Sequence, residues 1–241
     1  MEPQFYKGNR DAFMEKLAPG SLALFFSGVP VRKTADEDYA YFANRNFVYL
    51  TGMEQKDTIL MLEKDASGYR ETLFILPPNL IEERWTGARM KPEEIEAASM
   101  ISNFAYRDTF EEELKKVLAS GRIEKVYLDI DRMDGQVVVS GADSMETFLK
   151  QEYPNLLIEN SLPILKKLRL IKKPCEIRAM EKAQEITKAG ILAMMTHSKP
   201  GMYEYQYKAE YDYALAQHGV LEAGFPSIIS AGKNNFCIHY Y

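Results

Sequence analysis

The chain contains little cysteine, and its cysteines show no pattern of a cross-link or a metal site. Among its 241 residues only Cys175 and Cys237 are cysteines, and no Cys-x-x-Cys spacing occurs. Disulfide-stapled secreted domains and zinc ribbons both need several cysteines at set spacings. Both thiols are therefore expected to be buried and reduced, in a protein of the cytoplasm.

The chain also lacks a long apolar run, a leader segment and an excess of positive charge. Its start, from Met1 to Phe5, has neither a basic nor an apolar stretch, and no apolar run approaches the roughly 20 residues of a membrane-spanning helix. The net charge is −5 with both signs interspersed, whereas nucleic-acid-binding proteins normally present a basic face. We expect neither a membrane nor a nucleic acid as a partner.

Motifs for phosphate, dinucleotide or metal binding are missing as well. The glycines ahead of Lys233 have the wrong spacing for a phosphate loop, and no Ser or Thr follows this lysine. The glutamates at 82–83, 93–94 and 111–113 are typical of helix faces in water, and none has metal-ligand spacing with a histidine. The sequence thus predicts no metal ligand in this stretch.

The first part of the chain alternates short apolar runs with helical patterns. The two runs on either side of Ser67-Gly68 are predicted to form a hairpin or adjacent strands, and Asp143 with Glu146 fits a capping box at a helix start. Such alternation implies an α/β domain with a mixed sheet flanked by helices, which we assign to residues 1–161. The predicted strands are 22–27, 58–63, 71–76, 126–130 and 156–158, and the predicted helices begin at Pro92, span 110–119 and run through Leu149.

The pattern changes across the basic segment from Ser161 to Pro174, which we interpret as a solvated helix face and connector, with a nuclear localisation signal or an RNA patch as the weaker alternative. Long helices are predicted from Pro174 to His197 and from about Tyr203 to His218. These helices open a second domain at 162–241. The first is amphipathic, with one face formed by Ile177, Met180, Gln184, Thr187, Ile191 and Met194.

The chain has three histidines, and one of them lies outside a helical pattern. His197 and His218 fall at the ends of predicted helices, where the partial negative charge stabilises an imidazolium. His239 lies on the second strand of a strand pair predicted within 225–241, between two apolar or aromatic neighbours. It is either a satisfied core histidine or a group that transfers protons near neutral pH.

The single tryptophan, Trp85, stands in the polar run ERWTGARM, which predicts a loop. A tryptophan in such a loop is either a partial plug of the core or a contact with a partner subunit or a substrate. Both interpretations remain open from spacing alone.

Three segments resemble the creatinase and aminopeptidase P family. The first is YFANRNFVYLTGMEQKDTILML at 41–62, similar to the family's N-terminal domain with its aromatic-Leu-Thr-Gly run ahead of an apolar strand. The second is LRLIKKPCEIRAMEKAQEITKAG at 168–190, which resembles the first helix of the catalytic domain. The third is GFPSIISAGKNNFCIHYY at 224–241, similar to the stretch with the first active-site histidine. The segments follow the family's order, so the resemblance covers almost the whole chain.

The resemblance implies an Xaa-Pro aminopeptidase, which cleaves the peptide bond before a proline. The family joins an α/β N-terminal domain to a pita-bread catalytic domain that holds two divalent metals, commonly manganese, cobalt or zinc. His239 would be a catalytic residue on the substrate side rather than a metal ligand. Trp85 would bind substrate, as a tryptophan that in some members reaches a neighbouring subunit's active site. The expected partners are a peptide with proline in second position and further copies of the chain, in a homo-dimer or a larger homo-oligomer.

The chain departs from the family in its metal ligands. In the family two Asp, one His and two Glu follow the histidine that corresponds to His239, and none of them is present here. Lowering the pKa of a bound water from its bulk value to about 7 is worth roughly 12 kcal/mol of nucleophile activation. We therefore expect the pita-bread domain to be incomplete, and this stretch alone to bind no metal and to have no peptidase activity. The alternatives are a prolidase, a creatinase-like hydrolase, or a non-catalytic pseudo-peptidase for binding or oligomerisation, as in histone chaperones of the same superfamily.

Overall fold

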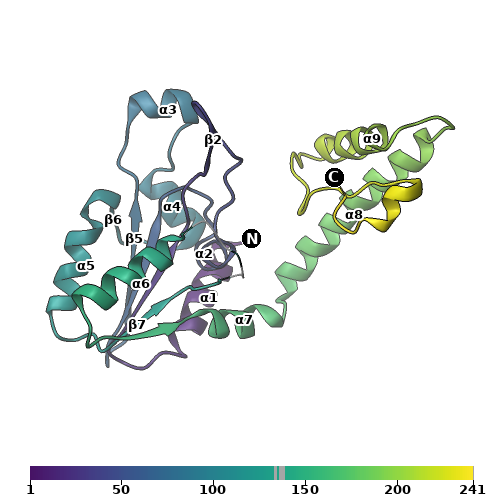
Figure 1. Cartoon of the computed structure of the whole chain (residues 1–241). Helices are drawn as coiled ribbons and strands as arrows, with labels where there is room; N and C mark the ends of the chain where they lie inside the picture. Colours follow the sequence, from purple (N-terminus) through teal and green to yellow (C-terminus); the bar gives the residue numbers. More distant parts are fainter. Residues whose placement is uncertain (133–134, 136–138, 241) are drawn as a thin grey trace. The chain divides into compact units, whose positions relative to one another are not determined.

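The structure of the chain is a computed structural model that describes residues 1–132, 135 and 139–240 (Figure 1). The chain divides into two compact units, Met1–Ile171 and Lys172–Tyr241, and each is described by itself. Tyr241, which the sequence places at the end of the predicted strand pair, lies outside the described residues.

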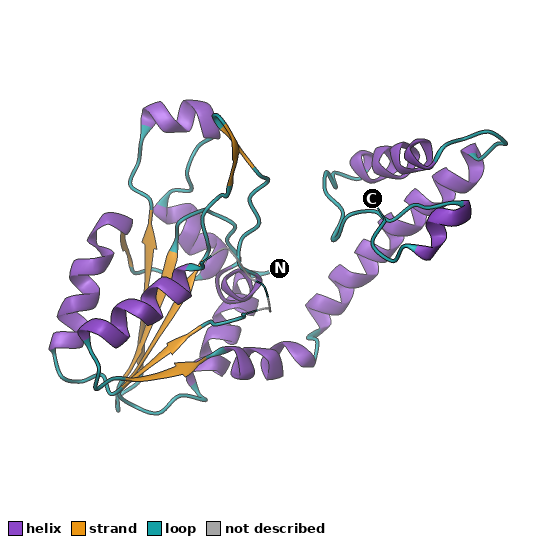
Figure 2. Ribbon diagram, in the orientation of Figure 1, coloured by secondary structure: helices purple, strands orange, loops and turns teal. Residues whose placement is uncertain are grey.

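The first unit is a six-stranded mixed sheet with helices on both faces (Figure 2). The strand order is β6-β5-β4-β1-β7-β8; β4 is antiparallel to both of its neighbours, β1 and β5, and the pairs β5–β6, β1–β7 and β7–β8 are parallel. The strands are β1 (Ser21–Phe26), β4 (Ile59–Lys64), β5 (Tyr69–Ile75), β6 (Phe104–Tyr106), β7 (Lys125–Leu128) and β8 (Leu157–Asn160), and a separate hairpin joins β2 (Arg32–Thr34) to β3 (Glu37–Asp38). The helices are α1 (Pro3–Met14), α2 (Arg45–Thr51), α3 (Leu80–Thr86), α4 (Pro92–Ser99), α5 (Phe110–Ala119), α6 (Gly141–Glu152) and α7 (Leu162–Leu170), with a 3₁₀ turn η1 (Arg107–Thr109).

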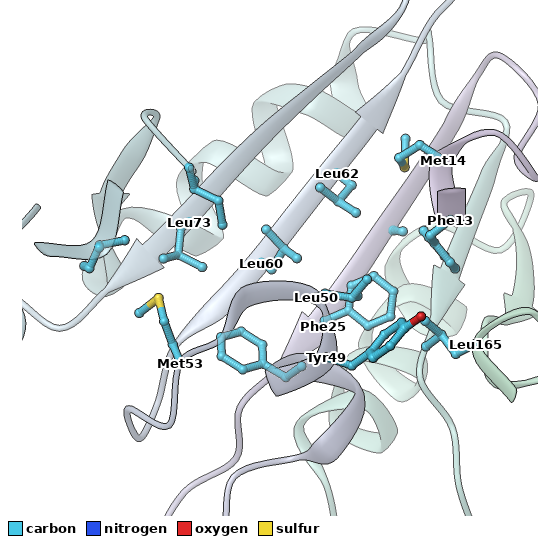
Figure 3. Packing of buried hydrophobic residues seen from close by; sticks show 14 of the residues in the cluster. Phe13, Met14, Phe25, Tyr49, Leu50, Met53, Leu60, Leu62, Leu73 and Leu165 are labelled. Carbon is cyan, nitrogen blue, oxygen red and sulfur yellow. The ribbon is translucent and has the colours of Figure 1, made fainter. Parts of the chain in front are cut away.

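Alternating side chains of the central strand fill two separate cores. Ala23 and Phe25 of β1 point to the face covered by α1, α2, α4 and α7, where Phe13 and Leu165 meet them (Figure 3). Leu22 of the same strand points to the opposite face, covered by α5 and α6. Successive residues of a strand face opposite sides, so an uninterrupted apolar run in β1 serves both cores. The predicted fold class, a mixed α/β sheet flanked by helices, is confirmed.

Several elements lie where the sequence predicts them, and one capping interaction differs. Helix α5 has the predicted bounds, and β4 and β5 form the predicted hairpin. The capping box of α6 joins Ser140 to Asp143, whereas the sequence suggested Asp143 with Glu146. The Ser140 hydroxyl accepts from the Asp143 backbone N–H, so the helix begins three residues earlier than that suggestion requires.

The short helix α2 was missed because its residues favour strands. Phe47, Val48 and Tyr49 are aromatic or β-branched, which is typical of strands. Interactions at both ends of the segment favour a helix instead. At its start the Asn44 side chain accepts hydrogen bonds from two backbone N–H groups. At the other end Gly52 has a φ of 76°, and a Cβ there would come within 2.4 Å of the Tyr6 ring.

The second unit contains α8 (Pro174–His197), α9 (Glu204–Gln217) and a 3₁₀ helix η2 (Gly232–Phe236). Helix α8 has the predicted bounds, and α9 begins one residue later and ends one residue earlier than predicted. The two helices approach closely at Gly190, where a Cβ would lie 2.5 Å from the Tyr211 ring. The packed side of α8 is therefore centred on Gly190, and Ile177 and Met180 of the predicted apolar face remain exposed.

The first compact unit ends at Ile171, ten residues beyond the expected domain boundary at 161, and helix α7 (Leu162–Leu170) lies between these two positions. Leu165 of α7 is buried in the core of the first unit, which keeps this helix with residues 1–161. The assignment of 1–161 and 162–241 as domains stays a prediction. Within the described ranges no helix is both long and apolar enough to cross a membrane.

Candidate functional site

His239 lies in a turn that follows η2, and its side chain is exposed. The predicted strand pair is wrong, since residues 225–240 form no strand in the structure. An isolated two-stranded hairpin is only marginally stable in water, and packing of its apolar face is what normally secures it. Here Phe236 and Ile238 are 90% and 84% exposed, so no such packing holds a hairpin in place.

The segment around His239 is fastened by one carboxylate, Glu204, at the first position of α9. Its Oε1 accepts from the backbone N–H of Ala231 at 2.6 Å, and its Oε2 accepts from the Tyr240 hydroxyl at 2.9 Å. The Asn234 side-chain amide donates to the two carboxylate oxygens at 2.9 and 3.2 Å, and to the Tyr240 hydroxyl at 3.0 Å. The carboxylate thus gathers donors from both sides of η2.

The charge of Glu204 is stabilised by these donors. Hydrogen bonds from Asn234 and then Tyr240 hold the pKa of the Glu204 carboxyl below its ordinary value. The same bond to the ionised carboxylate raises the pKa of the Tyr240 hydroxyl, with burial as a lesser cause. The two directions agree, because one bond favours an ionised carboxylate and a neutral phenol.

Sequence reasoning missed Glu204. Its only local signal is an acidic side chain in the first turn of a helix. This arrangement is common, because the helix dipole stabilises a negative charge there. Its partners lie 27 to 36 residues further along the chain, which no local spacing reveals.

The other two histidines lie at helix ends, as predicted. His197 ends α8, and its Nδ1 lies 2.5 Å from Glu210 Oε2 of α9. His218 is the C-cap residue of α9.

Trp85 lies in the helix α3 of the first unit rather than in the predicted loop. Its side chain is 86% exposed, so the interpretation as a core plug is wrong. Leu80 and Ile81 of the same helix are exposed as well, and α3 has no buried residue. Helix formation here follows from Asn79, whose side chain accepts from two backbone N–H groups of the first turn.

The described residues do not fit a metal centre. Among them no three His, Cys, Asp or Glu side chains gather closely enough to hold an ion. His197 with Glu210 supplies two donors, whereas protein zinc sites use three or four protein ligands. Cys175 and Cys237 are free thiols, and neither is buried as expected, since Cys175 is half-buried and Cys237 is exposed.

The described residues of both units line cavities with mainly apolar walls. In the second unit a cavity of about 600 Å³ lies between α8, α9 and residues 220–229. The cavity of the first unit, about 440 Å³, lies between α5, α6 and the end of β1. Arg107 at this cavity is paired with Asp57 at 3.0 Å.

Two family models match consecutive parts of the chain. The family described as aminopeptidase P, N-terminal domain, matches residues 6–127, and metallopeptidase family M24 matches residues 178–241. The Xaa-Pro aminopeptidase of Escherichia coli strain K12 is 27% identical over 242 aligned positions, which cover 98% of the chain and 54% of that protein.

Solved structures of similar proteins superpose on the whole chain. A Bacillus anthracis protein described as an aminopeptidase P has a TM-score of 0.95 and 30% identity over 100% of this chain and 57% of its own. Zinc-substituted E. coli aminopeptidase P in complex with product has a TM-score of 0.84 and 27% identity, covering 100% and 55%. The chain therefore spans about half the length of the relatives that it matches.

Proposed function

The chain belongs to the creatinase and aminopeptidase P family, and from this membership we propose that it forms the N-terminal domain and the opening of the peptidase domain of an Xaa-Pro aminopeptidase. The observation that carries the proposal is the order of the two family matches, N-terminal domain and then peptidase, within one continuous chain. The substrate is a peptide with proline in second position, and the reaction is hydrolysis of the bond before that proline. We place the protein in the cytoplasm.

The complete peptidase uses two divalent ions, of manganese, cobalt or zinc. Such a pair supplies a hydroxide nucleophile and polarises the scissile carbonyl when it is bound. The relative with zinc and product, together with the metallopeptidase match, supports divalent metals in the family. The described residues hold no ligand set, and in this proposal they contribute binding and positioning.

His239 has the substrate-side role in this proposal. Its imidazole is exposed beside a fastened segment, where a ring N–H donates a hydrogen bond to the peptide carbonyl and then to the tetrahedral oxyanion. A donor held in place before the charge develops stabilises the transition state more than the ground state.

Trp85 has a different role, at a subunit contact. An exposed helix with a tryptophan and two neighbouring aliphatic side chains, Leu80 and Ile81, is typical of an interaction surface. We propose that this surface contacts another copy of the chain in a dimer or a larger homo-oligomer, and that Trp85 reaches substrate bound there.

A comparison of two polypeptides tests the proposal. One is residues 1–241, and the other extends this chain through a whole peptidase domain. Both are assayed on an Xaa-Pro peptide with added manganese, cobalt or zinc, and again after chelation. We expect metal-dependent release of the first residue by the longer polypeptide only. Metal-dependent turnover by purified 1–241 would contradict the inactivity proposed for this stretch, and no turnover by the longer one would contradict the peptidase.

A second candidate function is a non-catalytic pseudo-peptidase for binding or oligomerisation, which the exposed apolar side chains of α3 favour. Metal content separates the two, since the longer polypeptide takes up two ions per chain in the enzyme and none in the pseudo-peptidase. Hydrolysis of creatine, which has no peptide bond, would identify a creatinase-like hydrolase. Hydrolysis of Xaa-Pro dipeptides would identify a prolidase.

A further inference from the structure

Glu204 contacts both sides of the short segment that contains His239. Its partners Ala231 and Asn234 precede His239, and its partner Tyr240 is the next residue along the chain. A segment held before and after a residue leaves that residue few backbone conformations. The bond to the Tyr240 hydroxyl thus restrains the side chain of the residue that directly follows His239.

The segment is also closed internally. The backbone N–H of Asn234 donates to the Ala231 carbonyl at 3.1 Å, and that of Cys237 donates to the Asn234 carbonyl at 3.0 Å. The Ser230 hydroxyl donates to the Asn235 side chain at 2.9 Å. Because these bonds make 230–237 one compact turn, a restraint at Ala231 and Asn234 is transmitted to its far end.

The backbone of Glu204 belongs to a helix that is packed against its neighbour. Glu204 begins α9, and α9 packs on α8 where Gly190 meets Tyr211 and Leu215. The first turn of α9 does not need the Glu204 side chain, because Gln206 caps it by accepting from the Tyr203 N–H at 2.8 Å. The Glu204 oxygens are therefore available to donors from outside the helix.

We propose that Glu204 is the positioning residue for His239: through Ala231, Asn234 and Tyr240 it sets where the imidazole is presented to the peptide substrate. This inference rests on the function proposed above, which gives His239 its place at the substrate. Glu204 does not touch substrate in this proposal and acts only through the segment.

Ring NMR of the whole 241-residue chain tests the positioning directly. With histidine as the labelled residue the spectrum contains three ring signals, and His239→Gln identifies the one from His239. In Glu204→Ala we expect the His239 signal to move toward that of an unstructured histidine, while the signals of His197 and His218 stay in place.

The controls separate positioning from unfolding. Asp212→Ala removes another carboxylate of α9, one that pairs with Lys208 and not with the His239 segment, and leaves the His239 signal unmoved. Tyr240→Phe removes a single hydroxyl and moves the signal in the same direction as Glu204→Ala, by less. Far-UV circular dichroism confirms that α8 and α9 persist in each variant.

The effect on reaction is measured in the polypeptide with a whole peptidase domain. Misplacement of a reacting group by about 1 Å costs up to 10²-fold in rate, so Glu204→Ala lowers kcat by at least about 10-fold with a smaller change in KM. Glu204→Gln, which keeps an oxygen acceptor, recovers part of this loss. Glu204→Ala combined with His239→Ala is no slower than His239→Ala alone, since both changes remove one function.

The outcomes are distinct. An unmoved His239 signal in Glu204→Ala overturns the inference, whatever the rates. A moved signal with a kcat loss that Glu204→Gln partly restores supports it. A moved signal with an undiminished kcat in His239→Ala supports the positioning by Glu204 and contradicts the proposed role of His239 in peptide hydrolysis.

Discussion

The guanidinium of Arg10 in α1 binds both carboxylate oxygens of Glu71 in β5, from Nε at 2.7 Å and from Nη2 at 3.1 Å. The Arg10 side chain is 0% exposed, and its remaining donors reach the backbone carbonyls of Leu50 and Ser99 at 2.8 and 2.9 Å. One buried cation therefore ties α1 to the end of α2, to the end of α4 and to the sheet.

Arg10→Met tests this relationship. Removal of one partner leaves a largely buried carboxylate and two carbonyls unpaired, which is expected to cost about 3–5 kcal/mol of unfolding free energy. Urea unfolding of the chain measures it. The matched control is Arg32→Met, because Arg32 pairs with Asp38 and both side chains are exposed, and exposed pairs contribute about 0–1 kcal/mol. Equal losses in both variants would contradict the special role of Arg10.

The buried carboxyl of Asp129, just after β7, predicts a pH dependence of stability. Burial, the largest cause, raises the pKa of Asp129 above its ordinary value, although the Asn46 amide donates to both of its oxygens at 2.9 and 3.0 Å. When the folded pKa exceeds the unfolded one, the folded chain holds more protons between the two values. This group therefore lowers stability as pH rises from the ordinary value of 3.8 through the folded pKa.

Asp129→Asn is expected to remove that contribution, so the unfolding free energy of the variant falls less, or rises more, between acid and neutral pH than that of the parent. Urea midpoints at a series of pH values measure the difference. The control is Asp143→Asn, whose carboxyl has a lowered pKa and stabilises the fold above its ordinary pKa, so its removal changes the slope in the opposite direction. The same slope for the parent and Asp129→Asn would contradict the prediction.

The contact at Gly190 predicts that α8 and α9 tolerate no larger side chain there. Gly190→Ala places a Cβ 2.5 Å from the Tyr211 ring and 2.9 Å from Leu215, and such overpacking typically costs about 1–3 kcal/mol. Hydrogen exchange of α8 and α9 measures the local loss. Tyr211→Leu in the Gly190→Ala background should restore part of the protection, whereas Gln184→Ala on the exposed side of α8 should change little.

The exposure of Trp85 predicts that its loss affects association and not folding. Trp85→Ala is expected to change the unfolding free energy by no more than about 0.5 kcal/mol, because surface substitutions usually stay within that range. The same variant should weaken self-association in analytical ultracentrifugation. Leu157→Ala, another exposed apolar side chain of the first unit, is the control and should leave association unchanged. Unaltered association of Trp85→Ala would contradict the proposed contact.

Elements with strong local signals could be predicted from the sequence. Helix α8 begins at Pro174 and α5 is followed by Gly121, and both have the predicted bounds. Proline at a first helical turn and glycine after a last one act through the local backbone, so they need no distant partner. Helix α2 was not predicted, because its aromatic and β-branched residues favour a strand. The packing of Tyr6 over Gly52 at its end is a tertiary contact that the local sequence does not reveal.

The candidate site could likewise be predicted only in part. His239 stood out in the sequence as a histidine in an apolar stretch, and the family resemblance supplied its expected role. Its setting did not follow, because a strand pair there depends on side-chain packing that 225–240 do not have in the structure.

By itself the sequence determined the family, the mixed α/β class of the first unit and the positions of its strongest helices, because these depend on local pattern and on motifs in order. Only the tertiary structure decided which groups meet. Arg10 finds Glu71 61 residues away, and Glu204 finds Tyr240 36 residues away. Such pairings form when packing brings distant segments together, so they cannot be predicted from the spacing of residues along the chain.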